Sequence, residues 1–244
     1  MSVVMHIARR ELRGYFATPV AWVFLVIFLA LAGILTFNQG GFFELNSADL
    51  SAFFKYHPWL YMLLVPAISM RLWAEERSSG TIELLMTLPV TMQQAVFGKF
   101  LAAWLFLLAA LVGTLPMWLT VSYLGEPDHG VILAGYLGSA LMAGAYLSVG
   151  AAFSALTRNQ VVAFVLSLMA SLLITLAGWP VVLDAFSGWA PDALVETVAS
   201  LSFMTRFEAI AQGVFELRDL VFFLLSMAFW LFLNAAILQR RKAN

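Results

Sequence analysis

Residues 100–125 read FLAAWLFLLAALVGTLPMWLTVSYLG and carry no charged side chain between Lys99 and Glu126. A transmembrane helix needs about 20 predominantly apolar residues, so this stretch predicts a membrane span. The whole chain has the same character, because 62% of its 244 residues are hydrophobic and 11% are charged. A soluble domain has about 45–50% apolar and about 25% charged residues. So few charges cannot cover a surface that faces water, and we therefore expect an all-α membrane protein.

Five further apolar stretches predict five further spans. They lie at about residues 20–37, 56–72, 131–156, 160–183 and 220–239. Together with residues 100–125 they give six transmembrane helices in a single domain, residues 20–244. Pro58 and Pro66 interrupt the second stretch, although prolines are tolerated in membrane helices.

The distribution of basic residues predicts the topology. An even number of spans places both termini on the same side of the membrane. If that side is the cytoplasm, ten of the 13 Lys and Arg residues lie inside, and Lys55, Arg206 and Arg218 lie outside. Cytoplasmic loops carry an excess of Lys and Arg. We therefore expect a multi-pass protein with both termini in the cytoplasm.

Residues 1–19 have the pattern of an amphipathic helix. Apolar side chains occupy one helical face, and Arg9, Arg10 and Arg13 occupy much of the remainder. A basic amphipathic helix of this kind lies in the membrane interface; the alternative is a plain positive flank to the first span. A cleaved signal peptide is disfavoured, because the apolar run that follows continues to Phe37 and is long enough to span.

The cytoplasmic segment 72–99 is longer than a simple connection between two spans requires. The sequence breaks at Ser78-Ser79-Gly80 and restarts with an acidic and apolar stretch from Thr81, which Pro89 ends. Thr91 with Gln94 three residues later forms a capping-box pattern that starts the next helix. We therefore predict a short, stiff amphipathic helix beneath the membrane; the alternative is an ordinary connecting loop.

Residues 184–219 are too polar to span and are expected outside. Pro191-Asp192 predicts the start of one short helix, and residues 203–213 predict another. The aromatic side chains of this segment indicate that it packs against the outer membrane face. An extracytoplasmic accessory protein would also bind here.

The fourth span contains small residues at four-residue steps, a pattern that lets two membrane helices approach closely. Such a face serves packing within one chain or between two chains, and packing within the chain is the commoner outcome. The four residues are Ala140, Gly144, Ser148 and Ala152.

Several kinds of chemistry are missing from the sequence. No phosphate-binding G-x-x-x-x-G-K-[ST] loop, zinc-binding H-E-x-x-H motif or G-x-S-x-G nucleophile motif occurs, so we predict no catalytic residue, no metal site and no cofactor in this chain. A net charge of −1 gives no electrostatic case for nucleic acid. The middles of the predicted spans carry no ionisable side chain of the kind that ion-coupled carriers use. Energy for any transport must therefore come from a partner on the cytoplasmic side.

Residues 70–89 carry a specific resemblance. They read MRLWAEERSSGTIELLMTLP, which resembles the MR-x-x-AEE-[KR]-x-x-GT-x-E-LL-x-T-x-P stretch of ABC-2 type permeases, and most closely that of the gliding-motility-associated GldF branch. Gly98-Lys99, the stretch LTRNQVVAF at 156–164, and Phe207-x-x-Ile210-x-x-Gly213-Val214 followed by Arg218-Asp219 are also similar to that branch. The resemblance covers essentially the whole chain.

This resemblance implies a bacterial plasma (inner) membrane protein with six spans, an N-terminal interfacial elbow helix and a coupling helix between the second and third spans. It also implies a dimer with a second permease copy or a paralogue, and a separate ABC ATPase that binds ATP and Mg. The residues that would dock on that ATPase are Glu75, Glu76, Arg77, Gly80, Thr81, Glu83, Leu84, Leu85 and Pro89.

Three functions are compatible with these observations. The leading hypothesis is the permease subunit of an ABC exporter, in which the short cytoplasmic helix transmits ATPase movement to the second and third spans. The alternative is a non-transporting mechanical or assembly subunit of an ATP-driven envelope complex. An intramembrane enzyme is disfavoured, because the spans contain no paired catalytic residues.

Overall fold

The computed structural model describes residues 3–44, 48–81, 90–187 and 191–242, and every regular element within these ranges is a helix. Four helical stretches among them are long and apolar enough to cross a membrane, namely Pro19–Gln39, Met92–Leu124, His129–Leu156 and Leu217–Arg240. They coincide with the predicted first, third, fourth and sixth spans. The all-α, membrane-embedded class is therefore confirmed, while the total of six spans stays a prediction.

The helix of the third predicted span starts earlier than its apolar stretch. α7 (Met92–Val112) begins at a capping box, in which Gln94 N–H donates to Thr91 Oγ1 and Thr91 N–H donates to Gln94 Oε1. The capping-box prediction is therefore confirmed. α7 is followed after Gly113 and Thr114 by α8 (Leu115–Leu124), and Pro116 lies in the first turn of α8, where its missing N–H costs no helical bond.

The helix of the second predicted span is followed without a connecting loop by a further helix. α4 (His57–Ser69) ends at Met70, and α5 (Arg71–Ser78) follows directly. The Ser154 hydroxyl donates to Met70 O and accepts from Trp73 N and Ala74 N. These contacts come from a helix 80 residues further along the chain, which is why the sequence pattern does not show the break.

The helix of the fifth predicted span is shorter than its apolar stretch. α10 (Gln160–Leu176) stops before residue 183, and α11 (Pro180–Ser187) begins at a proline. The Ser202 hydroxyl donates to Thr175 O near the end of α10. The carbonyl group of Thr175 thus has a hydrogen-bond partner outside α10, and the helix ends at the next residue.

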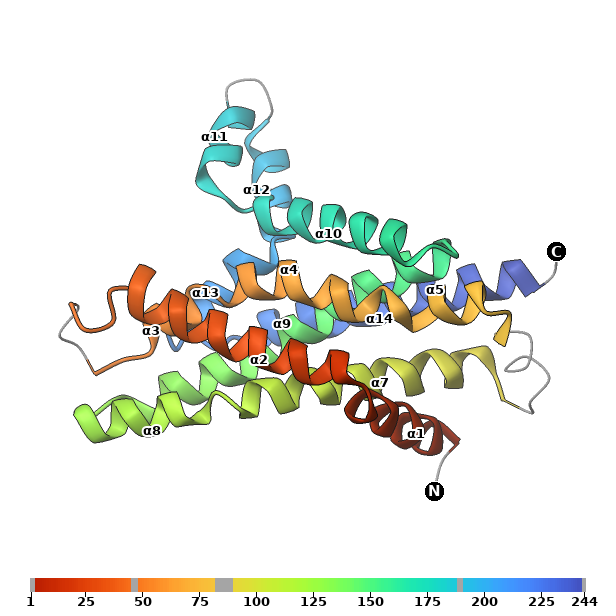
Figure 1. Ribbon diagram of the computed structural model, residues 1–244. Coiled ribbons are helices and arrows are strands. Elements are labelled where there is room, and N and C mark those ends of the chain that lie inside the picture. Colours follow the sequence, from red (N-terminus) through yellow and green to blue (C-terminus); the bar gives the residue numbers. More distant parts are fainter. Residues whose placement is uncertain (1–2, 45–47, 82–89, 188–190, 243–244) are drawn as a thin grey trace.

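The remaining helices complete the bundle. α1 (Val3–Ala17) precedes α2 (Pro19–Ile34), which continues as the π-helical turn η1 (Leu35–Gln39) toward α3 (Ser51–Phe54). Residues 184–219 contain the two expected short helices, α12 (Asp192–Ser200) and α13 (Phe203–Ala211), and α14 (Leu217–Lys242) follows. α11 and α12 project from the bundle at the end of α10 (Figure 1).

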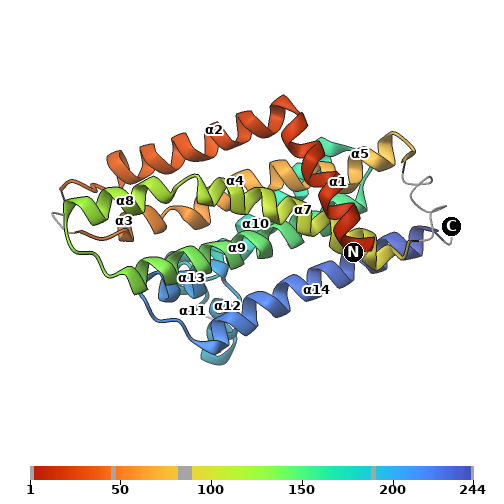
Figure 2. The same ribbon diagram turned by 90° about the horizontal axis from the view of Figure 1, so that it is seen from below.

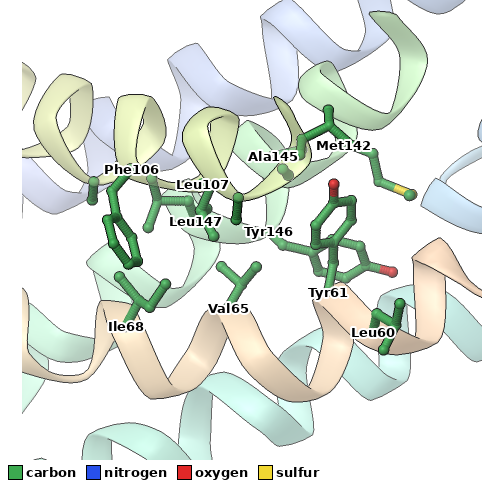
Figure 3. Packing of buried hydrophobic residues seen from close by; sticks show 14 of the residues in the cluster. Leu60, Tyr61, Val65, Ile68, Phe106, Leu107, Met142, Ala145, Tyr146 and Leu147 are labelled. Carbon is green, nitrogen blue, oxygen red and sulfur yellow. The ribbon is translucent and has the colours of Figure 1, made fainter. Parts of the chain in front are cut away.

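The central helix is α9 (His129–Leu156), which packs against α4, α5, α7, α10, α13 and α14 (Figure 2). Side chains of α4, α7 and α9 meet in the core, among them Tyr61, Val65, Phe106 and Tyr146 (Figure 3). Lipid is as apolar as these side chains, so close van der Waals packing, rather than escape from water, holds membrane helices together.

The two ends of the bundle differ in what they carry. α1, the end of α5 and the C-terminal end of α14 lie at one end (Figure 1). α3 and the connection between α8 and α9 lie at the opposite end. The described part of segment 72–99, the start of α1 and the C-terminal end of α14 therefore lie at one end of the bundle.

Candidate functional site

Lys99 on α7 is a buried cation shared by two other helices. Its side chain is 5% exposed, and Nζ lies 2.8 Å from Glu76 Oε1 on α5 and 3.3 Å from Glu11 Oε2 on α1. The ammonium also lies 5.4 Å from the centre of the Trp73 ring on α5. A buried charge is costly unless it is paired, so Lys99 holds α1 and α5 against α7. We call this cluster, together with Arg71, Glu75, Arg77 and Ser154, the α5 junction.

Close packing of α1 on α7 brings Glu11 within reach of Lys99. A Cβ atom added at Gly98 would lie 2.8 Å from Ile7 Cγ2 and 3.2 Å from Val4 O. Only glycine therefore allows this approach of the two helices. α1 keeps its basic side chains Arg9, Arg10 and Arg13 exposed on the other side.

α5 is fastened to the end of α9 by two polar side chains. Ser154 occupies the break between α4 and α5, as described above, and satisfies backbone groups of α5 that lack a helical partner there. Arg77 Nη1 donates to Ala155 O at 2.6 Å. Ala155 lies in the last turn of α9, where carbonyl groups are without helical partners and a cation is favourable.

A second ion pair lies on the open side of α5. Arg71 Nε and Nη2 donate to the two oxygens of Glu75 at 2.8 and 3.2 Å. This hydrogen bond from Arg71 holds the pKa of the Glu75 carboxyl below its usual value. The two side chains are 35% and 45% exposed, so water screens the pair and its contribution to stability is small.

The ionisation of Glu11 depends on its partners. Burial opposes the charge of this carboxylate, but Lys99 and Arg10 together outweigh that effect, so the pKa of Glu11 lies below its usual value. Arg10 Nη2 lies 2.7 Å from Glu11 Oε1. Glu11 is therefore charged at neutral pH and forms an ion pair with Lys99.

The structure brings together part of the docking set that the sequence suggested. Glu76 and Arg77 point into the α5 junction, and Glu75 lies at its edge. Gly80 has a φ of +73° just after α5, a left-handed conformation typical of a residue that ends a helix, and its space is open. Thr81 is exposed, and its hydroxyl lies 2.9 Å from that of Ser79. Glu83, Leu84, Leu85 and Pro89 lie outside the described residues, as does the predicted helix that they belong to.

Sequence reasoning missed Glu11 and Ser154, and it gave Lys99 no role of its own. Lys99 served only as the charge that bounds the apolar stretch 100–125. Its partners come from positions 88 residues before it and 23 residues before it, so no local pattern connects them.

The small residues of α9 face other helices of the same chain. A Cβ atom at Gly144 would lie 2.6 Å from Met227 Sδ on α14 and 3.0 Å from Trp104 Nε1 on α7. Trp104 Nε1 donates to Ala140 O at 2.9 Å. Ser148 and Ala152 are also buried within the chain.

The described residues contain no group of three His, Cys, Asp or Glu side chains that could hold a metal ion. The ion pairs and hydrogen bonds of the α5 junction instead link four helices, α1, α5, α7 and α9. Helix composition and this arrangement define a multi-pass membrane protein with a polar junction at one end of its bundle.

Comparison with protein families then gives the particular family. The profile described as "ABC-2 family transporter protein" matches residues 5–238, nearly the whole chain, and the protein belongs to this family. It is thus a membrane subunit of the ABC transporter type, and permeases of this family generally work with an ABC ATPase. No individual curated protein matches the chain.

Proposed function

We propose that this protein is the permease subunit of an ATP-driven exporter in the bacterial plasma membrane, with six spans and both termini in the cytoplasm. α1 is the interfacial elbow helix, α4 and α10 contribute the second and fifth spans, and the residues that follow α5 in the cytoplasmic segment 72–99 receive the ATPase. The functional unit contains a second permease copy or a paralogue, and ATP and Mg bind to the partner ATPase. The relationship to the GldF branch is part of this proposal.

The α5 junction is the observation that carries this proposal. Lys99 joins α5 to α1 and α7, and Ser154 and Arg77 join it to α9. A displacement of α5 therefore acts on three other helices at once. A helix attached at one end only would bend instead, and the movement of a docked ATPase would not reach the membrane spans.

We assign the docking of the ATPase and the transmission of its movement to different residues. Docking belongs to the residues that follow α5, of which Glu83 is the charged member, and transmission belongs to Lys99. In this division the residues beyond Gly80 meet the ATPase, whereas Glu76 and Arg77 act inside the permease. This refines the docking set, because Glu76 and Arg77 already have partners within the chain.

Affinity purification of the tagged permease from its own membranes tests both parts. Glu83→Lys is expected to lose the co-purifying ATPase, whereas Lys99→Met is expected to keep it but to lose the ATP-dependent change in permease conformation. Lys55→Glu, at the opposite end of the bundle, is the control and should change neither. If Glu83→Lys retains the ATPase and ATP hydrolysis in full, the docking assignment is wrong.

A transport assay in vesicles separates the exporter from the alternative, a mechanical or assembly subunit. The intact permease–ATPase complex is reconstituted, and ATP-dependent efflux of amphiphilic compounds is measured. ATP hydrolysis without efflux, together with retained binding of envelope partners, would favour the mechanical subunit.

A further inference from the structure

An apolar groove runs between α2 and α4, next to the α5 junction. It has a volume of about 200 Å³, and its walls include Val23, Phe24 and Ile27 of α2 and Leu64 and Ile68 of α4. Val23 is 56% and Ile27 41% exposed, so the groove opens on the outer surface of the bundle. Because α2 belongs to a stretch long and apolar enough to cross a membrane, this surface faces lipid.

The groove leads into a polar pocket at the end of the bundle that carries α1. This second pocket has a volume of about 150 Å³ and is lined by Glu11, Arg71, Glu75 and Lys99, among others. Tyr15, Thr18 and Arg71 line both spaces. The two spaces therefore adjoin, and an amphiphile with an apolar chain and a polar end would fit along them.

The polar pocket offers charges of both signs. Arg71 uses two of its five N–H groups for Glu75, which leaves three donors for a further acceptor. Glu75 is 45% exposed and Glu11 22% exposed, so both carboxylates accept further donors. Lys99 is 5% exposed and is already held by Glu11 and Glu76, so Arg71 is the accessible cation of this pocket.

The local charges select the kind of head group. The charged residues that line the pocket are two carboxylates (Glu11 and Glu75) and two cations (Arg71 and Lys99), so their charges balance. An anionic head group would add a negative charge without a compensating cation. A phosphate next to a primary ammonium leaves the balance unchanged, with the phosphate on Arg71 and the ammonium on the carboxylates of Glu75 and Glu11.

We propose that the groove and the polar pocket together bind one phospholipid with a primary ammonium in its head group, of the phosphatidylethanolamine type. One of its two acyl chains lies between α2 and α4, and its head group lies at Arg71. The lipid contacts α1 and α2 on one side and α4 and α5 on the other, so it lies beside α1 and α5, two of the helices that the α5 junction connects. This site is independent of the proposed docking of an ATPase.

Native mass spectrometry of the intact, detergent-purified protein tests the proposal without any ATPase. The protein is mixed with equal amounts of phosphatidylethanolamine, phosphatidylglycerol and phosphatidylcholine with identical acyl chains. We expect one retained phosphatidylethanolamine per chain. Val23→Trp fills the groove and should lower its retention by about tenfold, the effect of losing about 1.4 kcal/mol of binding free energy.

Two variants make the test specific. Val165→Trp is the matched control, because Val165 is also an exposed valine, on α10, and does not line the groove. It should retain the lipid. Glu75→Gln removes one negative charge and should shift the preference from phosphatidylethanolamine to phosphatidylglycerol.

Three results would overturn the proposal. Equal retention of the three lipids would show that the site does not prefer a head group with a primary ammonium. Equal lipid loss in Val23→Trp and Val165→Trp would show that the lipid does not bind in the groove. A change in oligomeric state in Val23→Trp, with lipid retention unchanged, would assign the groove to a second copy of the chain instead.

Discussion

Lys99 places a positive charge between two carboxylates that come from helices far apart in sequence. Lys99→Met preserves much of the volume but leaves Glu76 without its cation and Glu11 with Arg10 as its remaining partner. Removing one partner of a buried ion pair is strongly destabilising. Since both carboxylates are about a fifth exposed, we expect a loss of about 2 kcal/mol in the free energy of unfolding, less than the loss of about 3–5 kcal/mol for a fully buried pair.

Thermal unfolding in detergent, followed by circular dichroism, measures this loss. Arg10→Gln is the control, because Arg10 is 60% exposed and its pair with Glu11 contributes little. Glu76→Gln combined with Lys99→Met should restore part of the lost stability, because it removes the carboxylate that Lys99→Met leaves without its cation. A Lys99→Met variant as stable as the natural protein would show that the pairs do not hold the helices together.

The depressed pKa of Glu11 predicts acid sensitivity. Because the folded state holds this carboxyl at a lower pKa than the unfolded chain does, the folded state binds fewer protons. The stabilisation is fully present above the usual carboxyl value of 4.5 and is lost as the pH falls through the lower folded-state value. The melting temperature should therefore be level near neutral pH and fall in acid.

Melting curves of the natural protein and of Glu11→Gln over the acid range test this prediction. The variant should start from a lower melting temperature and lose less of it on acidification, because Gln does not titrate. Parallel curves for the two proteins would mean that Glu11 does not contribute to the acid sensitivity.

Single residues also show which features could not be predicted from the sequence. The cluster Glu75-Glu76-Arg77 stood out in the sequence, but the roles of its members differ in the structure. Glu75 pairs along the helix with Arg71, which the i,i+4 spacing indicates, whereas Glu76 and Arg77 turn toward α7 and α9. The direction of a charged side chain depends on which helices pack beside it, and that is a property of the folded bundle.

At the level of helices, Ser154 determines where α4 ends and α5 begins. Its hydroxyl contacts Met70 O, Trp73 N and Ala74 N, at distances of 2.8 to 3.2 Å. Ser154→Ala leaves these backbone groups without a side-chain partner, which costs about 1–3 kcal/mol for a buried group. We expect faster hydrogen exchange at the amides of Trp73 and Ala74.

Ser148→Ala is a matched control on the same helix. The Ser148 hydroxyl is also buried, but it donates to Ala145 O within α9 and touches no backbone group of α5 in the described part of the chain. Exchange in α5 should be unchanged in this variant. Similar exchange in both variants would show that Ser154 does not hold the break between α4 and α5.

Helix boundaries were predictable where local chemistry sets them. The capping box at Thr91 and Gln94 placed the start of α7 correctly, several residues before its apolar stretch. The ends of α4 and α10 depend instead on hydroxyl groups from Ser154 and Ser202, which are distant in sequence. Apolar stretches therefore located the membrane helices, and tertiary hydrogen bonds decided where two of them stop.

At the level of the whole molecule, α9 connects the junction to the rest of the bundle. It packs against α5 at one end and against α13 nearer the other, and it contacts α4, α7, α10 and α14 between them. A Cβ atom at Gly150 would lie 2.0 Å from Ser69 Oγ on α4, so this packing leaves little room for independent sliding of the two helices. Movement of α5 that reaches α9 is therefore passed on to the other helices together.

The orientation of the bundle in the membrane decides whether a cytoplasmic ATPase can reach α5. The chain contains no cysteine, so single cysteines report their side of the membrane without background. Ser79 and Ser51 are both exposed serines, one just after α5 and the other at the start of α3, at opposite ends of the bundle. With a membrane-impermeant maleimide on intact cells, Ser51→Cys should be labelled and Ser79→Cys should react only after the membrane is opened. Labelling of Ser79→Cys from outside would place α5 where a cytoplasmic ATPase cannot act, and the α5 junction would then have to serve a purpose other than transmitting ATP-driven movement.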